Sequence, residues 1–216
     1  MLVILAVRRP AAMGYDYDVF LSYLHEKPSG TWVMEHFLPY FQHQLGNALG
    51  RRAALFIDRT GIHLGQKWPA RLKQALARSC CLVGIWSPLY FQSEWCLCEC
   101  AVMRHREEKL GFGTRENTEG LIVGVRVNDG DHFPPYAKES QSGDMRQFFY
   151  DGNGFTQSPL YVDFQKRVNE FATEVARVVN NAPAWSEEWA TKEWLDDVFA
   201  GISAGAAPKA SQPLLA

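Results

Sequence analysis

The sequence has no long apolar run. No stretch reaches the ~20 apolar residues that a membrane-spanning helix needs. The apolar N-terminus, Met1–Val7, is short and is followed by Arg8 and Arg9, whereas a secretory signal peptide carries its positive charges first. We therefore expect neither a membrane span nor a signal peptide. Residues 1–14 are interpreted as a disordered leader, with an added edge strand as the alternative.

Cysteines are few, odd in number and crowded. The five are Cys80, Cys81, Cys96, Cys98 and Cys100. This arrangement is not a secreted disulfide framework, and it suits a reducing cytoplasm. The Cys-x-Cys-x-Cys run suggests a metal site at first sight, but on a helix the middle cysteine points away from the other two. We expect no metal and no resident cofactor.

The chain also lacks a dominant charge and the common catalytic motifs. Its net charge is −2 and its pI is about 6.3, which gives no electrostatic reason to expect nucleic acid as the main partner. The sequence contains no P-loop, no Gly-x-Ser-x-Gly elbow and no His-Glu-x-x-His motif. Gly111-x-Gly113 and Gly152-x-Gly154 lack the dinucleotide fingerprint and are interpreted as turns.

What the sequence does contain is an alternation of two hydrophobic periods. Short apolar runs predict strands at 17–23, 53–57, 81–86, 121–127 and 147–150. Helical spacing predicts helices at 31–49, 69–79, 94–109 and 158–181. Pro39 should kink or divide the first helix, and Ser93 is a good N-cap for the third. The segments 58–67, 110–120 and 128–144 are expected to be loops.

Alternating strands and helices indicate an α/β fold. Strands that are almost continuously apolar are typical of a parallel sheet covered on both faces. We expect a flavodoxin-like three-layer fold with a mostly parallel central sheet of about five strands, built from residues 15–182.

A C-terminal segment, residues 183–216, is expected to form an amphipathic helix and a flexible tail. Its apolar residues include Trp185, Trp189, Leu195, Val198 and Phe199. Such a large apolar set is unfavourable in water, and docking on the protein's own core is favoured over a surface for a partner.

Polar and aromatic side chains follow the predicted strands at one edge of the sheet. In parallel α/β sheets, ligands bind outside the carboxyl ends of the strands. The candidate substrate-binding residues at these ends are Ser22, Tyr23, Asp58, Arg59 and Ser87. The helix that begins at the same edge carries Trp95 and Glu99 on one face. Glu99 is the candidate catalytic acid, with a loop cap or an ion pair as the structural alternative.

Three segments carry a family resemblance. They are YDVFLSY at 17–23; FIDR at 56–59 with Gly61, Leu64, Gly65 and Trp68 after it; and Ser87-Pro88 followed by SEWC at 93–96 and Glu99. In this order they resemble three parts of Toll/interleukin-1 receptor (TIR) domains: the first strand, the second strand with its long BB loop, and the glutamate-bearing helix. The resemblance runs from about residue 15 to about residue 180.

The resemblance implies one of two functions. Many bacterial and plant TIR domains cleave NAD+ at the nicotinamide–ribose bond, and their catalytic glutamate lies on the helix that here carries Glu99. NAD+ would then be the substrate, and Trp68 would join the binding residues. The implied setting is similar to Thoeris antiphage defence, in which an ADP-ribose product, linear, cyclic or conjugated, reaches a separate effector. The alternative is a non-catalytic TIR–TIR signalling scaffold.

The loop at 58–67 is implicated in self-association. It is long for a strand-to-helix connection, where about two to six residues are usual. Its apolar tip consists of Ile62, His63 and Leu64. In the TIR domains that the chain resembles, this loop packs against a neighbouring TIR domain and completes the catalytic pocket. We therefore expect activity to depend on contact between copies of the domain.

Overall fold

Five parallel strands form the central sheet, in the order β2-β1-β3-β4-β5. The computed structural model describes residues 14–58, 70–112, 120–140, 142–152, 154–196 and 198. The strands are β1 Tyr17–Ser22, β2 Leu55–Ile57, β3 Ser79–Trp86, β4 Ile122–Arg126 and β5 Ser142–Asp144. This confirms the predicted α/β class with its parallel sheet of five strands.

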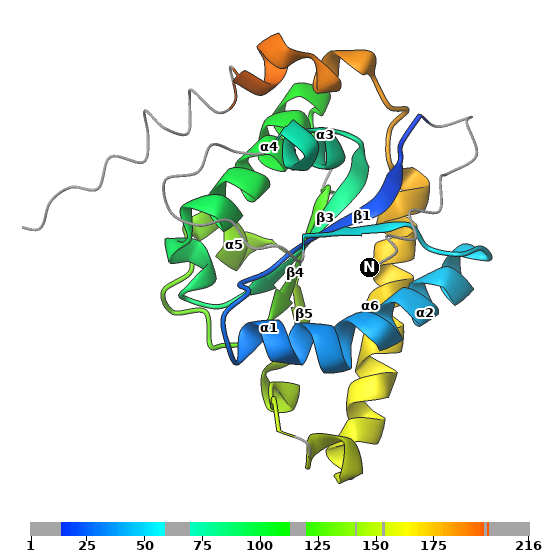
Figure 1. The fold of residues 1–216 in the computed structure, drawn as a ribbon, viewed down its shortest axis with the longest axis vertical. Helices are drawn as coiled ribbons and strands as arrows, with labels where there is room; N and C mark the ends of the chain where they lie inside the picture. The colour runs from blue at the N-terminus through cyan, green and yellow to red at the C-terminus, as the bar shows by residue number, and fades with distance from the viewer. Residues whose placement is uncertain are drawn as a thin grey trace, which may run out of the picture.

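Helices cover both faces of the sheet (Figure 1). The α-helices are α1 Ser29–Trp32, α2 Leu38–Leu49, α3 Ala70–Ala77, α4 Glu94–Leu110, α5 Pro135–Glu139 and α6 Leu160–Asn181. Shorter turns are the π-helix η2 Val33–Phe37 and the 3-10 helices η3 Tyr90–Gln92, η4 Arg146–Phe148, η5 Phe155–Gln157 and η6 Glu187–Ala190. In Figure 1, α2 and α6 lie on one side of the sheet, and α3 and α4 lie on the other.

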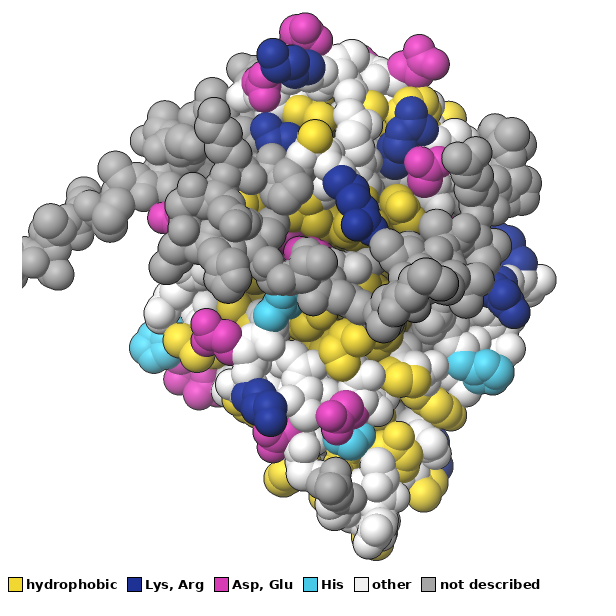
Figure 2. All heavy atoms as spheres, in the orientation of Figure 1, with side chains coloured by type: hydrophobic (Ala, Val, Ile, Leu, Met, Phe, Trp, Pro, Cys, Tyr) yellow, Lys and Arg dark blue, Asp and Glu magenta, His cyan; other side chains and the backbone are white. Residues whose placement is uncertain are grey.

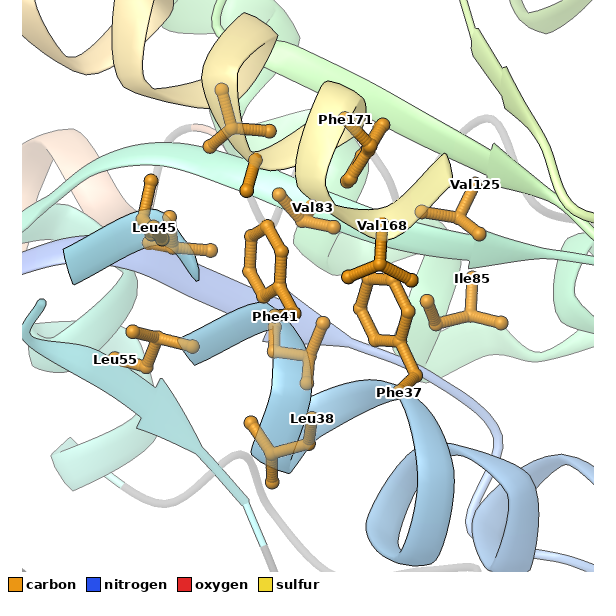
Figure 3. Close-up of a cluster of buried hydrophobic side chains, with 14 of the residues drawn as sticks. Phe37, Leu38, Phe41, Leu45, Leu55, Val83, Ile85, Val125, Val168 and Phe171 are labelled. Carbon is orange, nitrogen blue, oxygen red and sulfur yellow. The ribbon is translucent and has the colours of Figure 1, made fainter. Parts of the chain in front are cut away.

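The larger core lies between the sheet and the pair α2 and α6 (Figure 3). Phe37 and Phe41 stack with their ring centroids 5.0 Å apart, and both rings meet Phe171 of α6. Val83 and Val125 close this layer from the strands. The apolar stripe predicted for the last helix therefore docks on the sheet, since Val168 and Phe171 on that stripe are fully buried.

Strand alternation decides which side chains face α4. Val19 and Leu21 of β1 belong to the core under α2 and α6, whereas Phe20 belongs to the core under α3 and α4. Because side chains alternate between the faces of a strand, Ser22 shares the α4 side with Phe20. This places a hydroxyl group under α4 at the carboxyl end of β1.

The first helical region is divided, as Pro39 predicted. The chain is helical from Ser29 to Leu49, but the five residues before α2 form the π-helix η2. Proline has no N–H to donate and clashes with the preceding turn, so it is tolerated in the first turn of α2, where Pro39 lies.

The position of the fifth strand was predicted wrongly. The expected strand at 147–150 is not one; β5 is Ser142–Asp144, inside a segment predicted to be a loop that also contains α5. Aromatic content favoured 147–150, but Phe148 is instead buried against Phe164 of α6. The tripeptide Ser-Gly-Asp has low strand propensity, yet it pairs with β4, and the missing side chain of Gly143 leaves room for Phe171.

The C-terminal segment packs back on the domain. Residues 192–196 and 198 are helical, and Trp189, Leu195 and Val198 are buried. In Figure 1 this orange segment lies over the ends of α3 and α4. The expected docking on the protein's own core is thus seen for residues up to 198; Phe199 and the residues after it lie outside the described part.

The surface carries charges of both signs. On the face drawn in Figure 2, Lys and Arg side chains are interspersed with Asp and Glu side chains. In the described part of the chain, no helix is both long enough and apolar enough to cross a bilayer.

Candidate active site

Glu99 is held inside the protein by the helix that carries it. Ser93 caps α4 by accepting a hydrogen bond from the backbone N of Cys96, and so determines where the helix starts. Glu99 lies in the second turn, facing the sheet, with only 8% of its surface exposed. Ser22 Oγ donates a hydrogen bond to Glu99 Oε2. The structure therefore brings together two residues predicted separately, one from β1 and one from α4.

Burial dominates the electrostatics of this carboxyl group. Loss of hydration raises the pKa of Glu99 to about 8; the hydrogen bond from Ser22 opposes this rise, and the nearby charge of Asp58 adds to it. A carboxyl group with a pKa this far above its ordinary value is typical of functional sites. In the free protein, Glu99 is therefore largely protonated near neutral pH.

Tyr23 and Asp58 are joined where β1 and β2 end. The Tyr23 hydroxyl donates to the backbone oxygen of Asp58, with 3.1 Å between the oxygens, and lies 3.5 Å from Met34 Sδ. The Tyr23 ring is buried and packs on His25 at 4.8 Å. This contact ties the first residue after β2 to the end of β1 and so helps to determine where the Asp58 charge lies relative to Glu99.

Ser87 has a local structural contact. Its Oγ accepts a hydrogen bond from the backbone N of Tyr90 at 3.1 Å, which stabilises the turn between β3 and η3. After that turn, the fully buried Tyr90 lies against Ser22, and the two hydroxyl oxygens are 2.7 Å apart. Ser87 therefore contacts the turn that positions Tyr90, and Tyr90 in turn contacts Ser22.

Trp95 and Cys98 lie on the more open sides of α4. Trp95 is half-buried, four residues before Glu99, and Cys98 is also half-buried. Cys96 and Cys100 are buried, so the middle cysteine faces a different direction from its neighbours, as helical spacing predicts. Within the described residues, no group of three or more His, Cys, Asp or Glu side chains is placed to hold a metal ion.

Comparison with known proteins identifies the family. A family model described as TIR domain matches residues 19–179, which include most of β1, the other four strands and the helix of Glu99. The chain belongs to the TIR domain family.

A comparison with solved structures also found matches for this TIR domain. One is the set of TIR domains in the activated Roq1 resistosome that directly recognises the pathogen effector XopQ. It has 23% sequence identity and a TM-score of 0.35, and the alignment covers 85% of this chain and 99% of that chain. A comparison with curated proteins found no match.

Several predicted residues of the TIR domain lie outside the described part of the chain. They are Arg59 and Trp68 of the substrate-binding set, and Ile62, His63 and Leu64 of the loop expected to mediate self-association. The described residues place Ser22, Tyr23, Asp58, Ser87, Trp95 and Glu99 at the ends of β1, β2 and β3 and on α4. Of these, the structure shows a direct side-chain contact for Ser22 with Glu99.

Sequence reasoning missed Tyr90 and Cys100. Tyr90 contacts Ser22 at 2.7 Å and Cys100 Sγ at 3.2 Å, and it is as deeply buried as any residue in the core. The available signal was its place between the Ser-Pro turn and the capped helix, where a large residue must point inward. Its hydroxyl partners could not be read from the sequence, because they come from other elements.

Proposed function

We propose that this TIR domain cleaves NAD+ at the nicotinamide–ribose bond, with Glu99 as the catalytic carboxylate. The observation that carries the proposal is a buried glutamate at the carboxyl edge of a parallel sheet, where such folds bind ligands. It receives a hydrogen bond from Ser22 and has a pKa raised by burial. The resemblance to NAD-cleaving TIR domains, whose catalytic glutamate lies on this helix, also supports it.

One carboxylate is sufficient for this reaction. The C1′–N bond breaks and its electron pair leaves with nicotinamide, which departs as a neutral molecule and needs no proton. Water then adds to C1′ and releases a proton to give ADP-ribose; attack by a group of the nucleotide itself gives a cyclic product. The charge to be stabilised is that of an oxocarbenium-like ribose, and a carboxylate in a poorly hydrated position does this electrostatically.

Binding of NAD+ accounts for the ionisation of Glu99 that the mechanism needs. A buried carboxyl with a pKa of about 8 is mostly neutral at pH 7, yet the mechanism needs its anion. The pyridinium of NAD+ is a cation, and a cation beside a carboxyl favours the ionised form. Binding of NAD+ therefore lowers the pKa of Glu99 and creates the anion where the positive charge develops.

The other predicted residues have supporting roles. Trp95 is half-buried one turn from Glu99, and we assign it to hold the pyridinium by cation–π stacking. Tyr23, predicted as a substrate-binding residue, is buried and bonded to the Asp58 backbone, so we assign it to shaping the edge of the sheet. Asp58 and Arg59 are assigned to the ribose and phosphate groups, and Trp68 and Ser87 to the surrounding wall.

The product is proposed to act as a signal in antiphage defence. This setting rests on the motif resemblance to Thoeris-like TIR proteins, and it requires a separate effector that senses ADP-ribose or its derivative. None of the five cysteines is joined in a disulfide, which suits the reducing cytoplasm, where NAD+ is abundant and where we place the reaction.

A second candidate is a non-catalytic TIR–TIR scaffold. The observation that favours it is the burial of Glu99: a carboxyl that is 8% exposed and bonded to Ser22 could hold β1 and α4 together without any chemistry. In that case the acid would matter for stability and not for turnover.

Nicotinamide release separates the two candidates. Concentrated protein is incubated with NAD+, and the products are identified by mass spectrometry. We expect nicotinamide and an ADP-ribose species from the wild type, and turnover reduced by about 10²–10³-fold or more in Glu99→Gln. Glu108→Gln, an exposed acid on the same helix, is the matched control and should keep wild-type turnover. Equal nicotinamide release from Glu99→Gln and the wild type would reject Glu99 as the catalytic group.

A further inference from the structure

A chain of four buried side chains starts at Glu99. Ser22 Oγ donates to Glu99 Oε2, the Ser22 and Tyr90 hydroxyl oxygens are 2.7 Å apart, and Tyr90 Oη is 3.2 Å from Cys100 Sγ. All four residues are buried. Buried hydroxyl groups need hydrogen-bond partners, and here the hydroxyl groups of Ser22 and Tyr90 find theirs among these four side chains.

The protons available to these four side chains determine which group donates in each hydrogen bond. Burial raises the pKa of Tyr90 well above its ordinary value and that of Cys100 to about 12, so both keep their protons at neutral pH. When Glu99 is ionised, the single hydroxyl proton of Ser22 is used in the hydrogen bond that Ser22 donates to the carboxylate. Tyr90 must then donate to Ser22, and Cys100 must donate to Tyr90. The hydroxyl protons of Ser22 and Tyr90 and the thiol proton of Cys100 supply one donor for each of the three hydrogen bonds. The negative charge on Glu99 determines the donor in each bond.

A glycine on the neighbouring strand makes room for this chain. Gly84 of β3 lies beside Ser22 in the sheet. A Cβ at position 84 would lie 3.1 Å from Tyr90 Oη and 2.6 Å from Trp86 Nε1, so that one of these groups would have to move. Glycine at this position therefore allows the phenol of Tyr90 to reach Ser22.

We propose that Tyr90 is a positioning residue for Glu99, acting through Ser22, with Cys100 completing the chain. The role in turnover rests on the proposed NAD+ cleavage at Glu99. By donating to Ser22 Oγ, Tyr90 directs the one Ser22 proton to Glu99 Oε2. Hydrogen bonds in such a chain polarise one another, so the contact to the carboxylate is stronger than that of an isolated serine. One oxygen of Glu99 is thereby held in place while the carboxylate acts on the ribose.

Other groups around Glu99 also affect its titration. Asp58 at the end of β2 raises its pKa, and Ser22 of β1 lowers it. The thiol of Cys96 lies beside Ser22, and its own pKa is raised by burial and by the charge of Glu99. These groups are unchanged in Tyr90→Phe, so any change in that variant reports the missing phenol hydroxyl.

The proposal is tested first without NAD+. The δ-carbon of Glu99 is titrated by NMR in protein labelled with ¹³C-glutamate, and its resonance is assigned by its loss in Glu99→Gln. Tyr90→Phe should raise the pKa of Glu99 by about 0.5–1 unit, because the hydrogen bond to the anion weakens. Cys100→Ala should shift it in the same direction by less. Tyr161→Phe on α6 is a control away from these four side chains and should leave the titration unchanged.

A double-mutant cycle and kinetics complete the test. In a Ser22→Ala background, Tyr90→Phe should have no further effect on Glu99, since the link is absent. With NAD+, Tyr90→Phe should lower kcat by about 3–10-fold with little change in KM, and should shift the pH profile as it shifts the titration. An unshifted Glu99 titration in a folded Tyr90→Phe protein would overturn the proposal. Absence of NAD+ cleavage by the wild type would overturn the proposed function alone, because the titration still reports the chain.

Discussion

At the scale of single residues, Glu99 is a group whose charge is costly in the folded protein. Its pKa is 4.5 in an unperturbed setting and about 8 in the fold, mainly because of burial. The folded state therefore binds this proton more tightly than the unfolded chain does. By linkage, the stability that Glu99 contributes is fully present below pH 4.5 and is lost as the pH rises through about 8.

Glu99→Gln should therefore stabilise the protein in a pH-dependent way. Glutamine can still accept the Ser22 hydrogen bond but cannot ionise. Its advantage in free energy of unfolding should be small near pH 4 and should grow to on the order of 2–4 kcal/mol above pH 8, since one pKa unit corresponds to about 1.4 kcal/mol.

Thermal unfolding of both proteins at a series of pH values checks this prediction. Glu108→Gln, an exposed substitution, should show no such trend and serves as the control. A constant difference between Glu99→Gln and the wild type across the range would contradict the assigned pKa.

At the scale of elements, β5 depends on a close approach between a strand and a helix. The sheet gains its last strand from three residues, and Gly143 pairs with Val125 of β4. Phe171 of α6 packs directly against the backbone there, because a Cβ at position 143 would lie 2.6 Å from its ring. Because Gly143 has no side chain, it can pair with β4 while Phe171 of α6 packs against it.

Gly143→Ala should weaken this edge of the sheet. The added methyl must displace Phe171 or β5, and overpacking of this kind costs about 1–3 kcal/mol. Chemical denaturation should show a lower midpoint with an unchanged slope. Gly152→Ala is the matched control: a Cβ there meets nothing within 4 Å, so its midpoint should stay at the wild-type value. A normal midpoint for Gly143→Ala would mean that Phe171 yields at no cost.

At the scale of the whole molecule, the C-terminal segment joins α3 to α4 through Arg106. This guanidinium is fully buried, donates to the backbone oxygens of Ser79 and Ala77 at 2.8 and 2.9 Å, and lies 4.5 Å from the Trp189 ring centroid. Trp185 Nε1 also donates to the oxygen of Ala77, at 3.2 Å. A cation at the carboxyl end of α3 is favourable, and the two tryptophans shield it from water.

Truncation after Asn181 should lower the melting temperature. It would remove Trp185 and Trp189 and expose Arg106 with its apolar surroundings. Losing one buried tryptophan typically costs about 3–5 kcal/mol, which in a chain of this size corresponds to a fall of about 10 °C. The point variant Trp189→Ala should reproduce much of the fall, and Lys192→Ala, at an exposed position nearby, should not. An unchanged melting temperature with loss of partner binding would instead identify this segment as an interaction surface.

Activity should rise with protein concentration if the loop at 58–67 completes the site between copies. Specific activity and light scattering are measured together across a wide range of concentrations. Leu64→Asp or Ile62→Asp should suppress the rise without unfolding the domain, because a charge at the tip opposes burial against a neighbour. Leu64→Met keeps the tip apolar and is the control. Constant specific activity from a monomer would reject this dependence.

The elements that depend on local signals could be located from the amino-acid sequence alone. Short apolar runs located β1 to β4, helical spacing located α2, α4 and α6, Ser93 marked the start of α4, and Pro39 marked the division of the first helical region. These features depend on neighbours within a few residues, so they can be read along the chain. Parallel topology followed from the alternation, and with it the edge that carries Ser22 and Glu99.

The remaining features depend on contacts between residues that are far apart in the sequence. Ser22 is 68 positions from Tyr90 and 77 from Glu99, and Tyr90 approaches Ser22 beside a glycine at position 84 on β3. The same holds for β5, where Phe171 of α6 packs close to the backbone of Gly143. The raised pKa of Glu99 depends on the removal of water from around it. Burial, close approach and hydrogen-bond direction are properties of groups that meet only after folding, and no local pattern encodes them.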